Sequence, residues 1–194
     1  MPIELEAKVR VSDFNEIRSR LQALGAARKG VRLETNTYFD TPQHTLLSRD
    51  SGLRLRVVQP IEEDRVTQNS PAPPVITFKG PQMGTGLKQR QEIEVQVHDP
   101  TAAIELLAQL GFAVQLSFQK RRESWSLPGG CVVELDELPI LGRFVEVEGP
   151  SRQAVLELLD RLGLASGELI TTSYIAMLSE HLRGSPVHDR FIRL

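Results

Sequence analysis

Charged side chains occupy every second position in several strand-like segments of this chain of 194 residues. In residues 3–9, Glu4, Glu6 and Lys8 alternate with aliphatic side chains. Successive side chains of a β-strand point to opposite faces, so this segment would carry one apolar face and one charged face. The alternation recurs around positions 54–56, 88–94, 120–122, 134–136 and 146–148. An ordinary half-exposed strand carries mostly uncharged polar residues on its wet face, so the pattern predicts an unusually charged sheet.

The composition limits the classes of partner that the chain can take. A net charge of -2 and a pI near 6.1 give no overall attraction to nucleic acid or to an anionic membrane, so neither is expected as a partner. The single Cys131 cannot form an internal disulfide. The N-terminus has no signal-peptide hydrophobic region, and no apolar run reaches the length of a membrane span, which together favour a cytoplasmic protein.

Helix signals follow three of the charged strands. Ser12, Asp99 and Ser151 are typical N-caps, and each of the three following segments ends at a Leu-Gly pair suited to a C-terminal cap. A fourth helix is predicted over residues 171–183, and proline- or glycine-rich loops over 59–74 and 80–86. Further strands are predicted over residues 32–39, 52–59, 75–79, 87–97, 114–126 and 131–138.

The helices need an apolar surface, which the aliphatic faces of the strands can supply. The connections are short, so the sheet should be largely antiparallel. For one strand, a charged face exposed to solvent is the ordinary explanation. Several such strands favour a closed barrel with helices outside and charges inside, an α+β fold. Because an unpaired buried charge costs several kcal/mol, the charges of such a lumen must be hydrated, paired or bound to charged ligands.

The two kinds of charge indicate the kind of ligand. Mg²⁺ and Mn²⁺ bind carboxylate, water and phosphate oxygens. Arg and Lys bind phosphate oxygens, and two cations on alternate positions of a strand stand about 7 Å apart, a spacing that suits a chain of phosphates. Carboxylates and cations on the same faces therefore suggest a metal-bound polyphosphate.

The order of the motifs resembles a known family. The segment Glu4-Leu5-Glu6-Ala7-Lys8 looks like the N-terminal signature of the CYTH superfamily, the triphosphate tunnel metalloenzymes, which include class IV adenylyl cyclases and thiamine triphosphatases. Segments 37–42, 52–56, 76–81, 88–94, 120–122, 133–137 and 144–148 resemble the family's other motifs in the same order. Segments 76–81 and 88–94, with 172–174 near the last helix, look most like the class IV cyclase branch.

The resemblance implies an eight-stranded antiparallel β-barrel, a triphosphate tunnel, formed by residues 1–183 and followed by a tail of residues 184–194. It implies Mg²⁺ or Mn²⁺ as cofactor, with metal ligands Glu4, Glu6, Asp136, Glu146 and Glu148. Phosphates would be bound by Lys8, Arg54, Arg56, Lys79, Lys88, Arg90, Lys120 and Arg122. The residues expected to act in catalysis are Glu4, Glu6, Lys8, Arg54, Arg56, Lys120 and Arg122. Glu92, Glu94 and Glu134 would pair with the cations or contact metal directly.

Three functions remain open at this point. A cyclase would convert ATP to cyclic AMP and pyrophosphate, and a triphosphatase would hydrolyse inorganic tripolyphosphate, thiamine triphosphate or a nucleoside triphosphate. A third alternative is a module that binds polyphosphate or nucleotide without turnover. A homodimer is compatible with each. The four histidines are scattered without zinc-site spacing, and Phe118, Trp125 and Phe144 are expected in the core rather than stacked on a base.

Overall fold

Eight antiparallel strands close into a barrel in the computed structural model, which describes residues 3–61, 72–83, 87–183 and 191–194, without the side chains of residues 3 and 4. Around the barrel the order is β2-β3-β4-β5-β1-β8-β7-β6, and pairing of β2 with β6 closes it. The strands are β1 (Ile3–Val11), β2 (Ala27–Asp40), β3 (Gly52–Pro60), β4 (Val75–Lys79), β5 (Lys88–Gln96), β6 (Ala113–Ser126), β7 (Val132–Leu138) and β8 (Gly142–Glu148). The predicted α+β fold is confirmed.

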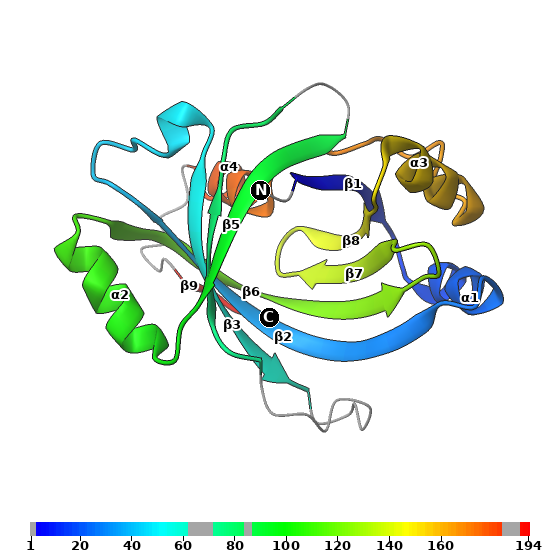
Figure 1. The fold of residues 1–194 in the computed structure, drawn as a ribbon, viewed down its shortest axis with the longest axis horizontal. Helices are drawn as coiled ribbons and strands as arrows, with labels where there is room; N and C mark the ends of the chain where they lie inside the picture. Colours follow the sequence, from blue (N-terminus) through cyan, green and yellow to red (C-terminus); the bar gives the residue numbers. More distant parts are fainter. Residues whose placement is uncertain (1–2, 62–71, 84–86, 184–190) are drawn as a thin grey trace.

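Within the described ranges, four α-helices accompany the barrel: α1 (Asn15–Ala23), α2 (Pro100–Gln109), α3 (Arg152–Arg161) and α4 (Tyr174–His181). Figure 1 shows α1 and α3 on one side of the barrel and α2 on the other. A 3₁₀ turn, η1 (Leu47–Arg49), lies between β2 and β3, and a short strand, β9 (Phe191–Ile192), pairs in parallel with β6. None of the helices in the described ranges is long and apolar enough to cross a membrane.

Two predicted N-caps are confirmed, and two helix starts differ from the prediction. The side chains of Asp99 and Ser151 accept hydrogen bonds from the first turns of α2 and α3. The first helix begins after Phe14 rather than at Ser12, because Asp13 first forms a turn by accepting from the backbone N–H of Asn15. The last helix begins at Tyr174, after the cap Ser173, rather than at residue 171. Much of loops 59–74 and 80–86 lies outside the described residues.

The outward faces of the strands supply the surface on which α1, α2 and α3 pack. Ala7, Val9 and Val145 are buried in one core with Leu21 of α1 and Leu158 of α3. This core also contains Trp125, as expected. A smaller core joins Leu107 of α2 to Phe39 and Leu55.

The last helix packs on a different surface. Its residues Tyr174 and Leu178 form a buried cluster with Phe118 and Phe144, to which Tyr38 adds. Phe118 shares its strand face with Lys120, and Phe144 shares its face with Glu146, because alternate residues of a strand point the same way. The inner wall is therefore apolar at one end, and α4 covers that end of the charged tunnel.

Candidate active site

The interior of the barrel contains a charged cavity of about 220 Å³. Of the residues that the structure describes, nine cationic and six anionic side chains line it, together with hydroxyl and aromatic groups. The cations are Lys8, Arg32, Arg54, Arg56, Lys79, Lys88, Arg90, Lys120 and Arg122, and the anions are Glu6, Glu92, Glu94, Glu134, Glu146 and Glu148. All eight residues predicted to bind phosphates are thus brought to one cavity.

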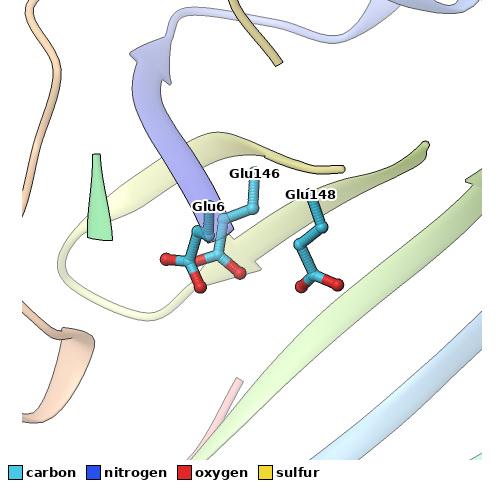
Figure 2. A group of neighbouring side chains, drawn as sticks. All are labelled: Glu6, Glu146 and Glu148. Carbon is cyan, nitrogen blue, oxygen red and sulfur yellow. The ribbon is translucent and has the colours of Figure 1, made fainter. Parts of the chain in front are cut away.

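Three of the predicted metal ligands lie together. One carboxylate oxygen each of Glu6, Glu146 and Glu148 lies within 4.8 Å of the other two. Figure 2 shows the three side chains, from β1 and β8. The antiparallel register causes this, because Glu6 of β1 lies opposite Glu148 of β8 and Glu146 shares a face with Glu148. Such closely spaced carboxylates repel one another and suit a hard divalent cation. The side chain of Glu4 is outside the described part of the chain, although its backbone pairs with β5.

The fifth predicted metal ligand, Asp136, is not part of this group of three and is joined to Glu146 through Arg122, whose Nη2 contacts both carboxylates. Its side chain is fully buried and accepts hydrogen bonds from Lys120 Nζ at 2.9 Å and from Arg122 Nε at 2.6 Å. Burial would lower the pKa of Arg122, but Asp136, Glu134 and Glu34 more than offset this and raise it well above its usual value. Both oxygens of Asp136 are thus engaged by cations that line the cavity.

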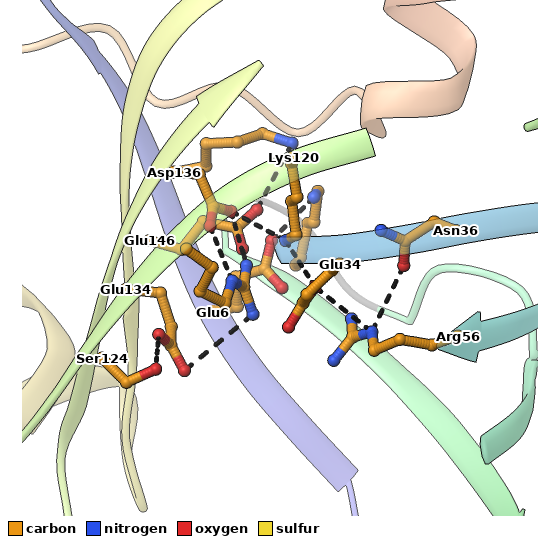
Figure 3. A network of polar contacts seen from close by, with 12 residues as sticks. Glu6, Glu34, Asn36, Arg56, Lys120, Ser124, Glu134, Asp136 and Glu146 are labelled. Atoms are coloured by element: carbon orange, nitrogen blue, oxygen red, sulfur yellow. Dashed lines mark hydrogen bonds and ion pairs between the residues drawn. The ribbon is translucent and has the colours of Figure 1, made fainter. Parts of the chain in front are cut away.

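A further buried carboxylate in the tunnel, Glu34 of β2, was not predicted from the sequence. It is fully buried, and its oxygens lie 2.9 Å from Arg32 Nε, 3.3 Å from Arg56 Nε and 3.5 Å from Lys120 Nζ (Figure 3). Burial would raise the pKa of Glu34, but Arg56, Lys120 and other cations hold it well below its usual value. Its sequence signal is weak, because Asn36 and the neighbouring threonines hide the alternation of charge in this strand.

Lys8 connects the tunnel to the segment that precedes α4. Its side chain is buried, and Nζ donates to the carbonyl of Thr172 at 2.7 Å and lies 3.8 Å from Glu146. The backbone N–H of Ile170 donates to the carbonyl of Lys8, which holds the same segment from the other side. Burial lowers the pKa of Lys8 to about 7, although Glu146 opposes the shift.

Lys88 is close to the carboxylate cluster. Its Nζ donates to Glu6 at 2.7 Å. Burial would lower the pKa of Lys88, but Glu6 and Glu146 more than offset this and raise it. Lys88 therefore neutralises part of the charge of the cluster.

The remaining predicted cations are held by polar partners along the wall. Arg54 Nη2 donates to Thr77 Oγ1 at 3.1 Å, and Arg56 Nε donates to Asn36 Oδ1 at 3.2 Å. Arg90 lies at the mouth, where it donates to the carbonyl of Gly80 at 2.7 Å and to Asp50 Oδ1 at 2.8 Å. These contacts fix the guanidinium groups before any ligand binds.

The three carboxylates predicted to pair with the cations have mixed partners. Glu92 forms an ion pair with Lys79. Glu94 accepts from Thr77 Oγ1 at 3.0 Å. Glu134 accepts from Ser124 Oγ at 2.5 Å and lies 3.5 Å from Arg32.

Comparison with known proteins identifies the family. The family profile of the CYTH domain matches residues 2–174, and the chain belongs to this family. It is 31% identical over 192 residues to a protein named adenylate cyclase CyaB from Aeromonas hydrophila, covering 92% of this chain and 90% of that protein. A protein from Methanocaldococcus jannaschii that is 26% identical over 184 residues, covering 90% of this chain and 98% of that protein, is named a putative adenylate cyclase.

Solved structures share the fold over nearly the whole chain. The PH1819 protein from Pyrococcus horikoshii OT3 has a TM-score of 0.76 at 27% identity, covering 92% of this chain and 99% of that chain. HpAC1 from Hippeastrum has a TM-score of 0.67 at 20% identity, covering 93% of this chain and 96% of that chain, and is described as having a dominant triphosphatase activity. At this identity the second likeness concerns the fold alone.

Proposed function

We propose that this protein is a metal-dependent adenylate cyclase that converts ATP to cyclic AMP and pyrophosphate. The observation that carries the proposal is the meeting of the Glu6, Glu146 and Glu148 cluster with nine cations in one cavity. A metal triphosphate presents the complementary charges, cation and phosphate oxygens, along its length. The choice of cyclisation rests on the relative from Aeromonas hydrophila, which carries that name.

The carboxylates would hold Mg²⁺ or Mn²⁺. Glu6, Glu146 and Glu148 would be ligands, and Glu4, two residues before Glu6 in the sequence, is a further candidate. Asp136 would act by orienting Lys120 and Arg122. The bound metal would neutralise phosphoryl charge and polarise phosphoryl oxygens.

The cations would hold and stabilise the triphosphate. Arg54, Arg56, Lys120 and Arg122 would meet its non-bridging oxygens and stabilise the charge that develops during transfer. The 3′-hydroxyl oxygen would form a bond to the α-phosphorus as the bond to the bridging oxygen breaks, which releases pyrophosphate and a proton.

Hydrolysis is the second candidate. The same cations and carboxylates would serve attack by water on the terminal phosphorus, and water is a smaller nucleophile than a ribose hydroxyl that must be positioned. The description of HpAC1 associates triphosphatase activity with a protein of the same fold. ATP, tripolyphosphate and thiamine triphosphate are then the candidate substrates.

Product analysis tests the assignment. The protein is incubated with Mg²⁺ or Mn²⁺ and, separately, with ATP, thiamine triphosphate and inorganic tripolyphosphate. We expect cyclic AMP and pyrophosphate in equal amounts from ATP. Orthophosphate without cyclic nucleotide would identify a triphosphatase instead, and tight binding without turnover of any of the three would identify a binding module.

Metal dependence is tested at Glu148, which is the least buried member of the cluster. Glu148→Gln should weaken Mn²⁺ binding at least about tenfold and lower turnover, because an amide is a poor ligand for a hard cation. Titration calorimetry measures the binding. Glu137→Gln is the control, since Glu137 pairs with Arg143 at 3.0 Å outside the tunnel. Full activity in excess chelator would contradict the metal assignment.

A further inference from the structure

Tyr174 brings a phenol from outside the barrel wall into the charged cavity. It is the first residue of α4, is 7% exposed and lines the cavity. Its ring packs edge-on against Phe144, with ring centroids 5.2 Å apart. The inner end of the tunnel is therefore completed by a residue far along the chain from the charged strands.

The ring of Tyr174 lies beside two of the cations. The ammonium nitrogens of Lys8 and Lys120 are 4.0 Å and 5.2 Å from its centroid. An ammonium group at this distance is attracted to the face of an aromatic ring. Both lysines also bind protein acceptors, since Lys8 donates to Thr172 and Lys120 donates to Asp136. The phenol is thus fixed relative to two groups that would meet an anionic ligand.

The hydroxyl of Tyr174 donates no hydrogen bond to any described residue. Its oxygen is buried and has no hydrogen-bond partner within the described residues. A buried polar group without a partner is uncommon and costs free energy, so it calls for a physical explanation. Burial raises the pKa of this phenol, and Asp136 and Glu146 raise it further, which keeps the hydroxyl protonated near neutral pH.

The nearby protein acceptors are already engaged. Asp136 accepts from Lys120 and Arg122, and Glu146 accepts from Arg122 at 2.5 Å. The donor that remains is next to cations suited to phosphate oxygens, which are strong acceptors. A phosphate oxygen that reaches this hydroxyl from the cavity would give it an acceptor, and the two lysines beside the ring would attract its charge.

We propose that the hydroxyl of Tyr174 donates a hydrogen bond to a phosphate oxygen of the bound triphosphate, beside Lys8 and Lys120. Tyr174 would then be a substrate-binding residue contributed by α4. The helix that covers the end of the tunnel would therefore also contact the bound triphosphate. The inference rests on the proposed triphosphate function. It applies equally to cyclisation and to hydrolysis.

The test uses Tyr174→Phe, which removes only the hydroxyl and keeps the ring. The probe is the bis-methylene analogue of tripolyphosphate with Mg²⁺, because its P–C–P bridges resist hydrolysis. We expect binding about ten- to hundredfold weaker by calorimetry, the range for loss of one hydrogen bond to a charged group. The melting temperature without ligand should stay the same or rise, since the variant removes an unpartnered buried group.

Ser117→Ala is the matched control. Ser117 is also a buried hydroxyl, but it bonds Thr37 Oγ1 at 2.9 Å and does not line the cavity. This variant should lower the melting temperature and leave affinity for the analogue unchanged. Tyr174→Phe should therefore weaken ligand binding without lowering the melting temperature, whereas Ser117→Ala should lower the melting temperature without weakening binding.

The possible outcomes distinguish a wrong role for Tyr174 from a wrong triphosphate function. If Tyr174→Phe binds the analogue as tightly as the unsubstituted protein, the role of Tyr174 is overturned while the triphosphate site stands. That role is also overturned if Tyr174→Phe melts at a lower temperature with unchanged affinity, which is the pattern of a structural hydroxyl. If the unsubstituted protein does not bind the analogue at all, the proposed function and the inference fall together.

Discussion

At the scale of single residues, Glu34 is the counter-charge on which several tunnel cations depend. It is fully buried, and the cations around it are partly exposed to the cavity, with side-chain exposures of 30% for Arg32 and 21% for Arg56. Removing one member of a buried charge network leaves the others uncompensated, which costs more than the intact pair gains. Glu34 therefore keeps cations close together that would otherwise repel.

Glu34→Gln should lower the free energy of unfolding by about 3 kcal/mol, the lower end of the range for a broken buried pair because water reaches the arginines. Urea denaturation measures the change. Glu16→Gln, at an exposed pair with Arg20 on α1, is the control and should change stability by less than about 0.5 kcal/mol. Equal effects of both substitutions on the free energy of unfolding would show that the tunnel cations do not depend on the charge of Glu34.

At the scale of elements, Asp40 organises the connection between β2 and β3. Its Oδ1 accepts from the backbone N–H of Thr41 at 2.7 Å and of Leu46 at 2.9 Å, and Oδ2 accepts from Leu47 at 2.9 Å. The same connection ends at Asp50, which binds Arg90 at the tunnel mouth. One carboxylate thus fixes the path of a segment that supports a predicted phosphate-binding residue.

The stability supplied by Asp40 should depend on pH. Burial would raise its pKa, but the backbone donors of Leu46, Leu47 and Thr41 lower it below the ordinary value of 3.8. Because the folded pKa is depressed, the contribution is present above pH 3.8 and is lost as pH falls through the folded pKa. The melting-temperature difference between the unsubstituted protein and Asp40→Asn should therefore shrink on acidification.

Asp160→Asn, at an exposed position of α3, is the control for the exchange of a carboxylate for an amide. At neutral pH it should change the melting temperature less than Asp40→Asn does, because exposed substitutions away from special features have small effects. A difference for Asp40→Asn that stays constant down to pH 2 would mean that the charge of Asp40 is not what the backbone donors recognise.

The elements could be predicted where local chemistry determines them. The strand Val75–Lys79 is found at its predicted bounds because Pro74 and Gly80 delimit it, and the caps Asp99 and Ser151 act through neighbouring backbone groups. The connection after Asp40 was not predicted, because its hydrogen bonds depend on loop geometry. The packing of α4 on Phe118 and Phe144 was also missed, since alternation tells which side chains share a face but not which helix covers them.

For the candidate site, the sequence predicted which residues gather but not all of their side-chain partners. Alternation brings the eight predicted phosphate-binding residues to one cavity and places Glu6 beside Glu146 and Glu148. The partners of Asp136 depend on side-chain conformations across two strands, which sequence periodicity does not contain. The roles assigned to the predicted site residues in binding and catalysis stay predictions.

At the scale of the whole molecule, closure of the barrel gathers more positive than negative groups around its cavity. Of the described residues, nine cationic and six anionic side chains line it, while Glu34 and Asp136, buried on the inner faces of β2 and β7, offset part of the excess through their ion pairs with the lining cations. A polyanion with its metal should therefore stabilise the folded barrel, because the unfolded chain has no such arrangement.

Mg²⁺ with the bis-methylene tripolyphosphate analogue should raise the melting temperature in a saturable way, with about 2.7 kcal/mol of stabilisation at a hundredfold excess over Kd. Differential scanning fluorimetry measures the shift. Arg56→Met should reduce it, whereas Arg143→Met, at an exposed pair on the outer surface, should not. Equal shifts from orthophosphate at the same ionic strength would indicate general salt stabilisation instead of a tunnel ligand.

The pairing of β2 with β6 also sets how long one edge of β2 stays unpaired as the chain is synthesised. Asp40 pairs with Ala113 and Ala27 pairs with Ser126, so β2 has its second neighbour only after β6 has been made, and the ring is complete only after β8 follows. During this interval one edge of β2 lacks its native partner, and an open strand edge can pair with another chain. The feature that makes the finished tunnel continuous thus leaves the growing polypeptide open to wrong association until more than half of it has emerged from the ribosome.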